Sequence, residues 1–230
     1  MTEPASTVRQ LPRGRHGLPR EQVIASQRDR ILDAMAEAMA ENGYVGTSVA
    51  AVLKRAGVSR ETFYEQFRSK EDCFEAAYER AVDQSLSRIA ESAAPLVDSA
   101  EADQDRPVSP DLERMGRILG AYLDGLADEP AYARLFLVEV YAVGSTAVAR
   151  RALLQESFVG LIADVLGART EEQRFACQTL AAAISAMVTA RIAVNDLDGL
   201  RGLRGPLLDL VRRSGDLFGT AMVHHGAVRA

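Results

Sequence analysis

The chain has 230 residues, of which 47% are hydrophobic and 26% charged, and its formal net charge is −5 at pH 7. This composition is typical of a soluble globular protein with one large or two small domains, and it argues against extensive disorder. The longest apolar run, residues 180–194, is shorter than the roughly 20 residues of a bilayer span, and no apolar segment at the N-terminus suggests a signal peptide. We therefore expect a cytoplasmic protein without a membrane-spanning segment.

The residue types that most often bind metals or carry catalysis are sparse. Cys73 and Cys177 lie far apart in apolar helical patterns, so core thiols are favoured over a redox sensor. The histidines are His16 and the adjacent pair His224 and His225, which would point in different directions on a helix. The sequence has no G-x-S-x-G motif, no phosphate-binding loop and no dinucleotide fingerprint. We predict no metal, no cofactor and no enzymatic activity.

The charge is distributed unevenly along the chain. Residues 1–70 contain 11 Lys+Arg against 8 Asp+Glu, whereas residues 71–230 contain 16 against 24. The positive excess lies in residues 1–20, which are rich in proline and glycine and predict a flexible basic leader. Arg13 and Arg15, flanked by glycine, are candidates for insertion into a narrow DNA minor groove. A solvated tail is the alternative interpretation of this leader.

Residues 21–70 predict a small helical domain. An apolar stripe at helical spacing first predicts a long helix that ends at Asn42-Gly43. Thr47 or Ser48 can then cap a short helix, and Gly57 allows the left-handed conformation that ends it. Ser59 follows at once as the cap of a second short helix. Two short helices joined by a tight glycine turn form a helix-turn-helix.

The second short helix has one buried and one exposed side. Phe63 and Phe67 are four residues apart and are predicted to point inward. The exposed first turn, docked in a major groove, would present side chains that hydrogen-bond to base edges, and Lys70 after the helix could pair with a backbone phosphate. The exposed residues of this helix are Arg60, Glu61, Thr62 and, on the rim, Tyr64.

The quoted residues resemble the tetracycline-repressor-type (TetR) family of transcriptional regulators. The resemblance covers residues 27–79 and rests on ILDAMAEAMAENGY, TSV, AGVSRETFYEQF and SKED in this order. It implies a dimeric repressor of palindromic operator DNA, with a C-terminal domain that binds a small-molecule effector. It assigns phosphate contacts to Thr47, Tyr64 and Lys70, and base contacts to Arg60 and its neighbours. The remaining residues of the predicted DNA-binding set are Ser48, Ser59, Glu61, Thr62, Arg13 and Arg15.

The rest of the chain is also helical in pattern. Residues 71–93 predict a connecting helix, and residues 94–110, with three prolines and several carboxylates, predict a surface linker. Residues 111–230 predict a ligand-binding and dimerisation domain, and no segment shows the alternation of an amphipathic strand. The predicted fold is therefore all-α, with an N-terminal three-helix helix-turn-helix domain and a larger C-terminal helical bundle. The predicted breaks between helices in this bundle are at 128–130, 144–145, 167–170 and 196–205.

Two helices near the C-terminus are predicted to form a dimer interface. The stretch 180–194 is apolar nearly all round, and its alanines allow another backbone to come close. The next helix carries apolar residues in near-heptad spacing. Two helices from each subunit would form a four-helix interface about a two-fold axis, with burial inside one monomer as the alternative. The predicted interface residues are Ile184, Met187, Val188, Leu207, Leu210, Val211, Leu217 and Phe218.

The remaining helices are predicted to enclose a small-molecule pocket. Aromatic side chains mixed with a few polar groups on neighbouring helices are typical of such a lining, although they are also common in plain cores. The resemblance to TetR-type regulators favours the pocket. The predicted lining residues are Arg117, Tyr122, Leu126, Phe136, Tyr141 and Phe158.

Three functions agree with the sequence. The first is a dimeric repressor that responds to an effector. The second is a constitutive DNA-binding protein whose larger domain serves only dimerisation. The third is a small-molecule carrier or enzyme with a vestigial helix-turn-helix, which would not protect DNA at moderate salt.

Overall fold

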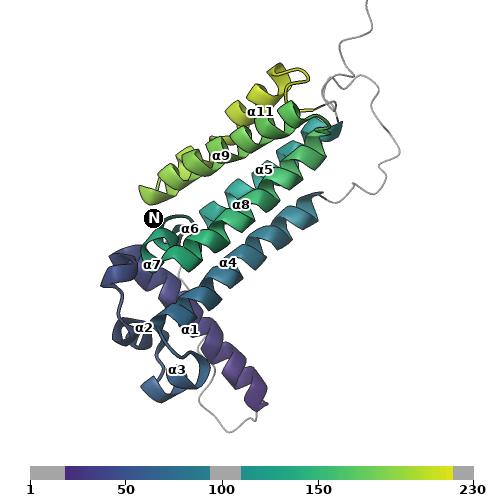
Figure 1. Cartoon of the computed structure of the whole chain (residues 1–230). Helices are drawn as coiled ribbons and strands as arrows, with labels where there is room; N and C mark the ends of the chain where they lie inside the picture. Colours follow the sequence, from purple (N-terminus) through teal and green to yellow (C-terminus); the bar gives the residue numbers. More distant parts are fainter. Residues whose placement is uncertain (1–18, 94–109, 220–230) are drawn as a thin grey trace, which may run out of the picture.

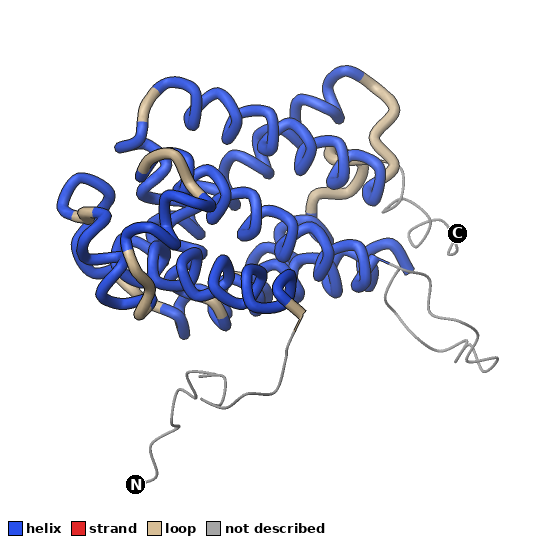
Figure 2. The backbone as a smooth tube through the Cα atoms, turned by 90° about the horizontal axis from the view of Figure 1, so that it is seen from below, coloured by secondary structure: helices blue, strands red, loops and turns tan. Residues whose placement is uncertain are grey.

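The fold is built from α-helices. The computed structural model describes residues 19–93 and 110–219, and within them every regular element is helical (Figure 1, Figure 2). The all-α class is thereby confirmed. Predictions on the remaining residues, including Arg13 and Arg15, lie outside the described part of the chain.

The first three helices form a small bundle at one end of the molecule (Figure 1). α1 (Arg20–Gly46) packs against both α2 (Val49–Ala56) and α3 (Arg60–Gln66). Phe63 and Phe67 are each 1% exposed and belong to the same core as the apolar stripe of α1. Two fully buried aromatic rings contribute much of the packing energy of so small a domain.

The first helix is kinked where the sequence predicts its end. Gly43 has φ 69° and ψ 168°, a conformation open to glycine, and the chain then completes one further turn to Gly46. A Cβ atom at position 43 would lie 3.4 Å from Oε2 of Glu139, a residue of the larger bundle. The kink therefore lies at one of the contacts between the two bundles.

The larger bundle is formed by α4 (Lys70–Ala93) and the helices after the linker. α4 leaves the small bundle and runs alongside α5, so it belongs to both bundles (Figure 1). The remaining helical elements are α5 (Pro110–Asp128), α6 (Pro130–Arg134), η1 (Leu135–Glu139), α7 (Val140–Val143), α8 (Ser145–Leu166), α9 (Glu171–Ala193), α10 (Leu197–Arg201) and α11 (Arg204–Arg213).

The segment between Pro130 and Val143 is not one regular helix. Its central turn, η1, is π-helical and joins α6 to α7. Such wide turns are rare and are found frequently at functional sites. Four of its five residues are buried, including Glu139. The apolar pattern of this segment predicts a helix but carries no sign of the wider turn.

The C-terminal helices differ from the predicted segments. The predicted break at 196–205 contains the short helix α10, which Asp196 caps by accepting a hydrogen bond from the backbone N–H of Gly199 at 2.9 Å. α11 ends at Arg213, and Gly215 then has a left-handed φ of 59°. Leu217 and Phe218 therefore follow the helix and do not extend its heptad pattern.

α9 is a long apolar helix. By length and composition alone it could cross a membrane, with a mean hydropathy of 1.4 over an 18-residue window of which 39% is buried. It packs against α8 on one side and keeps an exposed side. The core helix of a soluble protein meets the same criterion, and packing within the bundle accounts for the buried part.

Both cysteines are buried and free, as core thiols should be. Burial raises the pKa of Cys73 to about 12 and also raises that of Cys177. Within residues 19–93 and 110–219, no group of three or more histidine, cysteine or acidic residues has a geometry that could hold a metal ion.

Candidate DNA-binding surface and ligand cavity

The two short helices of the small bundle are held by local capping. The Ser48 hydroxyl accepts a hydrogen bond from the N–H of Ala51 at 3.2 Å, and the Ser59 hydroxyl accepts one from the N–H of Thr62 at 3.1 Å. Gly57 ends α2 with φ 64° and ψ 38°, in the left-handed region. These three features confirm the predicted helix-turn-helix. Ser48 and Ser59 are exposed, and each hydroxyl accepts a capping hydrogen bond while its own O–H can still donate.

The first turn of α3 presents an exposed polar surface. Arg60 and Glu61 are exposed, and the Tyr64 ring is 47% exposed beside the buried Phe63, 5.3 Å away and edge-on. Thr62 is half-buried, and its hydroxyl lies 2.9 Å from that of Ser59. Arg60, Glu61 and Tyr64 therefore lie on one surface, as expected for a helix that enters a major groove by its N-terminus.

Two predicted phosphate contacts have another role in the structure. Thr47 is buried, and its hydroxyl donates to the carbonyl oxygens of Ala38 at 3.1 Å and Gly43 at 2.8 Å. The Lys70 ammonium donates to the carbonyl oxygens of Tyr44 at 2.9 Å and Thr47 at 3.1 Å, and it lies 4.0 Å from the Tyr44 ring centroid. Both side chains close the frayed end of α1. The burial of Thr47 corrects its assignment to phosphate in this conformation, whereas the phosphate contact of the half-buried Lys70 stays a prediction.

Tyr44 connects the small bundle to the larger one. Its backbone N–H donates to Oε2 of the buried Glu139 at 2.8 Å, and its hydroxyl donates to Oε1 of Glu71, also at 2.8 Å. The other oxygen of Glu139 lies 3.3 Å from Nε of Arg134. Burial, and next the hydrogen bond to Glu71, raise the pKa of the Tyr44 hydroxyl far above its ordinary value, so it remains a donor. The π-helical turn thus holds the kinked end of α1 through a carboxylate.

A continuous row of aromatic rings leads from this junction into the larger bundle. The ring centroids are 5.7 Å apart for Tyr44 and Phe74, 6.0 Å for Phe74 and Tyr78, and 5.6 Å for Tyr78 and Phe136. The guanidinium of Arg151 lies 5.0 Å from the Phe136 ring centroid. Packed side chains of this kind are a physical connection between α1, α4, η1 and α8.

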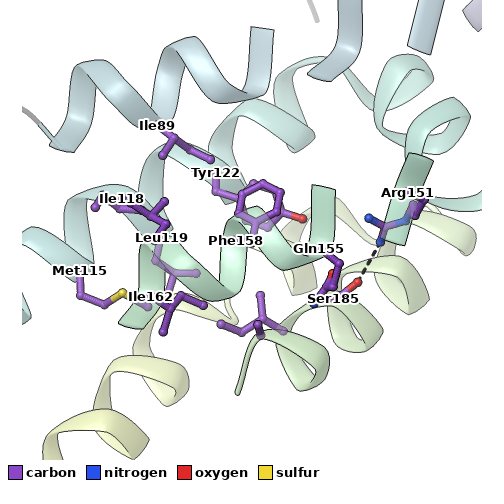
Figure 3. Close-up of a pocket in the computed structure, with 13 residues that line it drawn as sticks. Ile89, Met115, Ile118, Leu119, Tyr122, Arg151, Gln155, Phe158, Ile162 and Ser185 are labelled. Carbon is purple, nitrogen blue, oxygen red and sulfur yellow. Dashed lines mark hydrogen bonds between the residues drawn. The ribbon is translucent and has the colours of Figure 1, made fainter. Parts of the chain in front are cut away.

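A cavity of about 50 Å³ lies at the end of this row, among α4, α5, α8 and α9. Tyr122 and Phe158, both predicted, line it with ring centroids 5.4 Å apart (Figure 3). Burial raises the pKa of Tyr122 to about 12. Polar side chains gather at one end in Figure 3, where Nη2 of Arg151 donates to the Ser185 hydroxyl at 2.8 Å. The other lining residues include Ile89, Met115, Ile118, Leu119, Gln155, Leu161, Ile162, Ala181 and Ile184.

The other four predicted pocket residues do not line this cavity. Arg117 faces away from the cavity and donates from Nε to the Ser92 carbonyl oxygen at 3.2 Å. A helix turns by about 100° per residue, so the next position on α5 faces the cavity instead. Leu126 and Phe136 border a smaller hollow on the other side of α5 and η1. Tyr141 is exposed. Residue type alone does not determine which face of a helix a side chain occupies.

Most of the predicted dimer residues are buried inside the subunit. The side chains that remain exposed are Met187, Leu210 and Leu217. Phe175, which the sequence analysis did not select, is 69% exposed on α9, and Ala182, Ala186 and Ala190 form an exposed stripe on the same helix. Only the exposed residues of the predicted interface could therefore contact a second subunit, and the interface itself stays a prediction. The buried residues of the predicted set are Ile184, Val188, Leu207, Val211 and Phe218.

Sequence reasoning missed the polar end of the cavity and the junction residue Glu139. A signal for the first is present, because the apolar stripe of α8 at Ile162 and Phe158 continues backward at helical spacing to Gln155 and Arg151. A charged residue on the inward stripe of a helix is a candidate for function. Glu139 has no comparable signal, since its place depends on the π-helical turn.

Comparisons with known proteins agree with this arrangement. Residues 31–77 match the sequence profile described as bacterial regulatory proteins, tetR family. A 62-residue segment is 37% identical to the fatty acid metabolism regulator protein of Bacillus subtilis strain 168, and it covers 27% of this chain and 32% of that relative. The matched segment thus spans about a third of the relative's length.

Solved structures with the same fold cover most of the chain. A TetR-like transcriptional regulator from Rhodococcus sp. RHA1 has a TM-score of 0.61 at 20% identity, over 84% of this chain and 96% of that one. FadR from Bacillus subtilis, crystallised in complex with stearoyl-CoA, has a TM-score of 0.64 at 18% identity, over 80% of this chain and 96% of that one. At these identities the similarity establishes the fold of both bundles.

Proposed function

We propose that this chain, whose residues 31–77 match the tetR family of bacterial regulatory proteins, is a dimeric transcriptional repressor whose operator affinity is changed by a small-molecule effector. A single observation carries the DNA-binding part. The capped helices α2 and α3 expose Arg60 and Tyr64 on one surface, while Phe63 and Phe67 anchor that surface to α1. Such a protein acts in the cytoplasm on double-stranded DNA.

The cavity supports the effector part of the proposal. It is lined mainly by apolar side chains, with a few polar groups at one end, which is the usual lining of a small-molecule site. The FadR structure of similar fold holds stearoyl-CoA, and a segment of this chain is similar to a fatty acid metabolism regulator. A ligand with an aliphatic chain therefore suits this cavity. Because the enclosed volume is only about 50 Å³, such a ligand must move the surrounding helices apart.

The exposed side of α9 supports dimerisation. Phe175 and Met187 are exposed there, and the alanines between them would let a second helix approach closely. Leu210 and Leu217 border the same surface groove as Phe175. Burial of this apolar surface against the same surface of a second copy would form a two-fold interface, and two helix-turn-helix units could then bind a palindromic site.

The contacts between the bundles support a route of coupling. A ligand that displaces Arg151 or Phe136 would disturb the row of rings that reaches Tyr44, and it would also disturb the π-helical turn that carries Glu139. α4 offers a parallel route, because it contacts the cavity through Ile89 and the small bundle through Phe74. Either movement would reorient α3 relative to its copy in the dimer.

Selection of bound DNA tests the proposal directly. The full chain is incubated with fragmented genomic DNA at moderate salt, and the retained fragments are sequenced and tested in gel-shift assays. We expect a palindromic site bound much more tightly than random DNA, and release by an acyl compound such as stearoyl-CoA. Equal affinity for the selected and the random fragments would contradict the proposal.

A constitutive dimeric DNA-binding protein is the second candidate. The small volume of the cavity favours it, because a bundle without a ligand site needs no larger space. This candidate predicts the same selected DNA site but no change in affinity with any compound. The release arm of the experiment therefore separates the two candidates.

A further inference from the structure

Arg151 is a buried cation without a counter-ion. Its side chain lies in the cavity wall, and the residue is only 6% exposed. No carboxylate lies within 4 Å of its guanidinium among the residues that the structure describes, where ion pairs are formed by other arginines. A guanidinium withdrawn from water is strongly disfavoured unless it is paired. The site therefore lacks the negative charge that would balance it.

The contacts that Arg151 does make leave its charge unbalanced. Nη2 donates to the neutral hydroxyl of Ser185, and the guanidinium faces the Phe136 ring. Nε has no hydrogen-bond partner. The Tyr78 ring packs against the same Phe136 ring, and the Tyr78 hydroxyl is also buried without a hydrogen-bond partner. The Arg151 guanidinium therefore keeps at least one N–H without an acceptor in the cavity wall.

The rest of the cavity is apolar and restricts the kind of anion. Phe158, Ile118 and Met115 extend away from Arg151 along the cavity (Figure 3), without another charged side chain in its lining. A dianion or a ligand with a polar body would leave charges and polar groups unpaired there. One negative group at the end of an aliphatic body matches both the charge and the lining.

We propose that this cavity binds a free aliphatic carboxylic acid, with its carboxylate paired to Arg151 and its chain along Phe158 and Ile118. The inference rests on the proposed function only in taking this cavity as the effector site. It differs from binding of an acyl thioester, whose carbonyl is uncharged and would leave the guanidinium without a counter-ion. A carboxylate and a guanidinium have matching planar geometry and form two parallel hydrogen bonds.

This orientation puts the charged end of the ligand next to the row of rings. The carboxylate would bind the guanidinium that lies over Phe136 of η1, and the Phe136 ring in turn packs against Tyr78 of α4 in the row that reaches Tyr44. A free acid would draw the guanidinium from its position over Phe136. The ligand group that gives the site its selectivity would then also be the group that signals to the DNA-binding domain.

Calorimetry with three matched probes tests the proposal on the full chain without DNA. The probes are dodecanoate, 1-dodecanol and dodecanoyl-CoA, which share one chain and differ in the head group. We expect dodecanoate to bind most tightly. Replacement of Arg151 by glutamine, which removes the charge and keeps a polar side chain, should weaken dodecanoate binding by about 10- to 150-fold and leave 1-dodecanol binding unchanged.

Arg150→Gln is the matched control, because this neighbouring arginine is half-exposed and pairs with Glu79 outside the cavity. It should leave the binding of all three probes unchanged. Arg151→Lys, which keeps the charge but not the planar fork, should recover part of the affinity for dodecanoate. Circular dichroism of each variant shows whether it is folded.

Equal loss of dodecanoate and 1-dodecanol binding in a folded Arg151→Gln variant would overturn the proposal. Tight binding of dodecanoyl-CoA that is insensitive to Arg151→Gln would also overturn it, while the effector-dependent repressor would still stand. DNA selection, which uses neither variant nor probe, reports separately on the proposed function.

Discussion

The two bundles differ in where the hydrogen-bond partners of their polar groups lie in the sequence. In the small bundle, the polar groups that cap or close helix ends have partners nearby in sequence, as Ser48, Ser59 and Thr47 show, and the side-chain oxygen of Gln66 is the buried atom without a partner among the described residues of α1, α2 and α3. In the larger bundle, Arg151 and Tyr78 have buried polar atoms without partners, and Glu139 finds its partner 95 residues away. Local hydrogen bonds of this kind stabilise the helix ends of a rigid DNA-binding unit. A ligand site needs groups that a ligand completes.

The junction between the bundles combines both patterns. Tyr44 is tied to α4 by Glu71 and Lys70, and to η1 by Glu139. All three ties end on one short segment after the kink at Gly43. Movement in the larger bundle therefore acts on this segment, close to the N-terminus of α2, and also on the middle of α1, where the Tyr132 hydroxyl donates to Asp33 at 2.7 Å.

The strongest test of the small bundle as a rigid unit is Phe63→Ala. Removal of a fully buried ring should lower the free energy of unfolding by about 3–5 kcal/mol. Tyr64→Ala, at the exposed neighbouring position, should cost far less. Urea unfolding followed by circular dichroism measures both. A loss below about 1 kcal/mol for Phe63→Ala would mean that the small bundle is loosely packed.

The exposed side of α9 is tested by Met187→Asp. A charge at this position in a dimer would be buried without a partner, so we expect the dimer dissociation constant to rise by roughly 100-fold or more. Leu86→Asp is the control, since Leu86 on α4 has a similar exposure, 39% against 37%. Sedimentation at micromolar concentration distinguishes the outcomes. A monomeric wild-type chain would refute the interface.

The contrast between the bundles also explains what the sequence could predict. Ser48, Gly57 and Ser59 act within four residues of their own positions, so their roles follow from local pattern and from steric rules. Phe63 and Phe67 likewise follow from helical spacing. The fold class and the limits of most helices could be predicted for the same reason, including the break at Gly144.

The cavity and the junction could not be predicted from the sequence, because their contacts join residues that are far apart in the chain. Lys70 was assigned to phosphate from its residue type, but its ammonium is held by carbonyl groups more than 20 residues earlier. Ile184 and Val188 were assigned to an interface from their apolar run, but the run continues round the helix and these two face the subunit core. The kink at Gly43 places the carbonyl groups that Lys70 binds, and the π-helical turn places the carboxylate of Glu139.

The DNA-reading surface is tested by Arg60→Ala. If Arg60 reads a base edge, its loss should cost about 1–3 kcal/mol on the selected site and relax specificity at that position. Tyr64→Phe should instead weaken the selected and random sequences alike. Fluorescence anisotropy at fixed salt measures both. Equal losses of Arg60→Ala on specific and random DNA would remove Arg60 from the reading surface.

The junction is tested by Glu139→Ala. This change leaves the buried N–H of Tyr44 without an acceptor, which should lower the free energy of unfolding by about 1–3 kcal/mol. Glu139→Gln keeps an acceptor and should cost less. Urea unfolding compares the two. Equal stability of Glu139→Ala and the wild type would show that water replaces the carboxylate and that the contact is not a structural tie.

The corrected role of Thr47 predicts the smallest effect. Thr47→Val removes the hydroxyl that closes the end of α1, at a cost of about 0.5–1.5 kcal/mol, and Thr47→Ser should restore most of it. DNA affinity measured well below the unfolding temperature should be unchanged. A stable Thr47→Val variant with weakened binding to all DNA sequences would reinstate the phosphate contact.

The measurement that tests the central claim is calorimetric titration of the acyl probe with the largest effect in the release assay, either dodecanoate or stearoyl-CoA, into the full chain with and without its selected operator. Coupled sites must affect each other equally, so the factor by which the probe changes operator affinity must reappear as the factor by which the operator changes probe affinity. We expect a common factor of about 5–150. A probe that binds with the same affinity in the presence and absence of operator would contradict the coupling of this cavity to the DNA-binding domain.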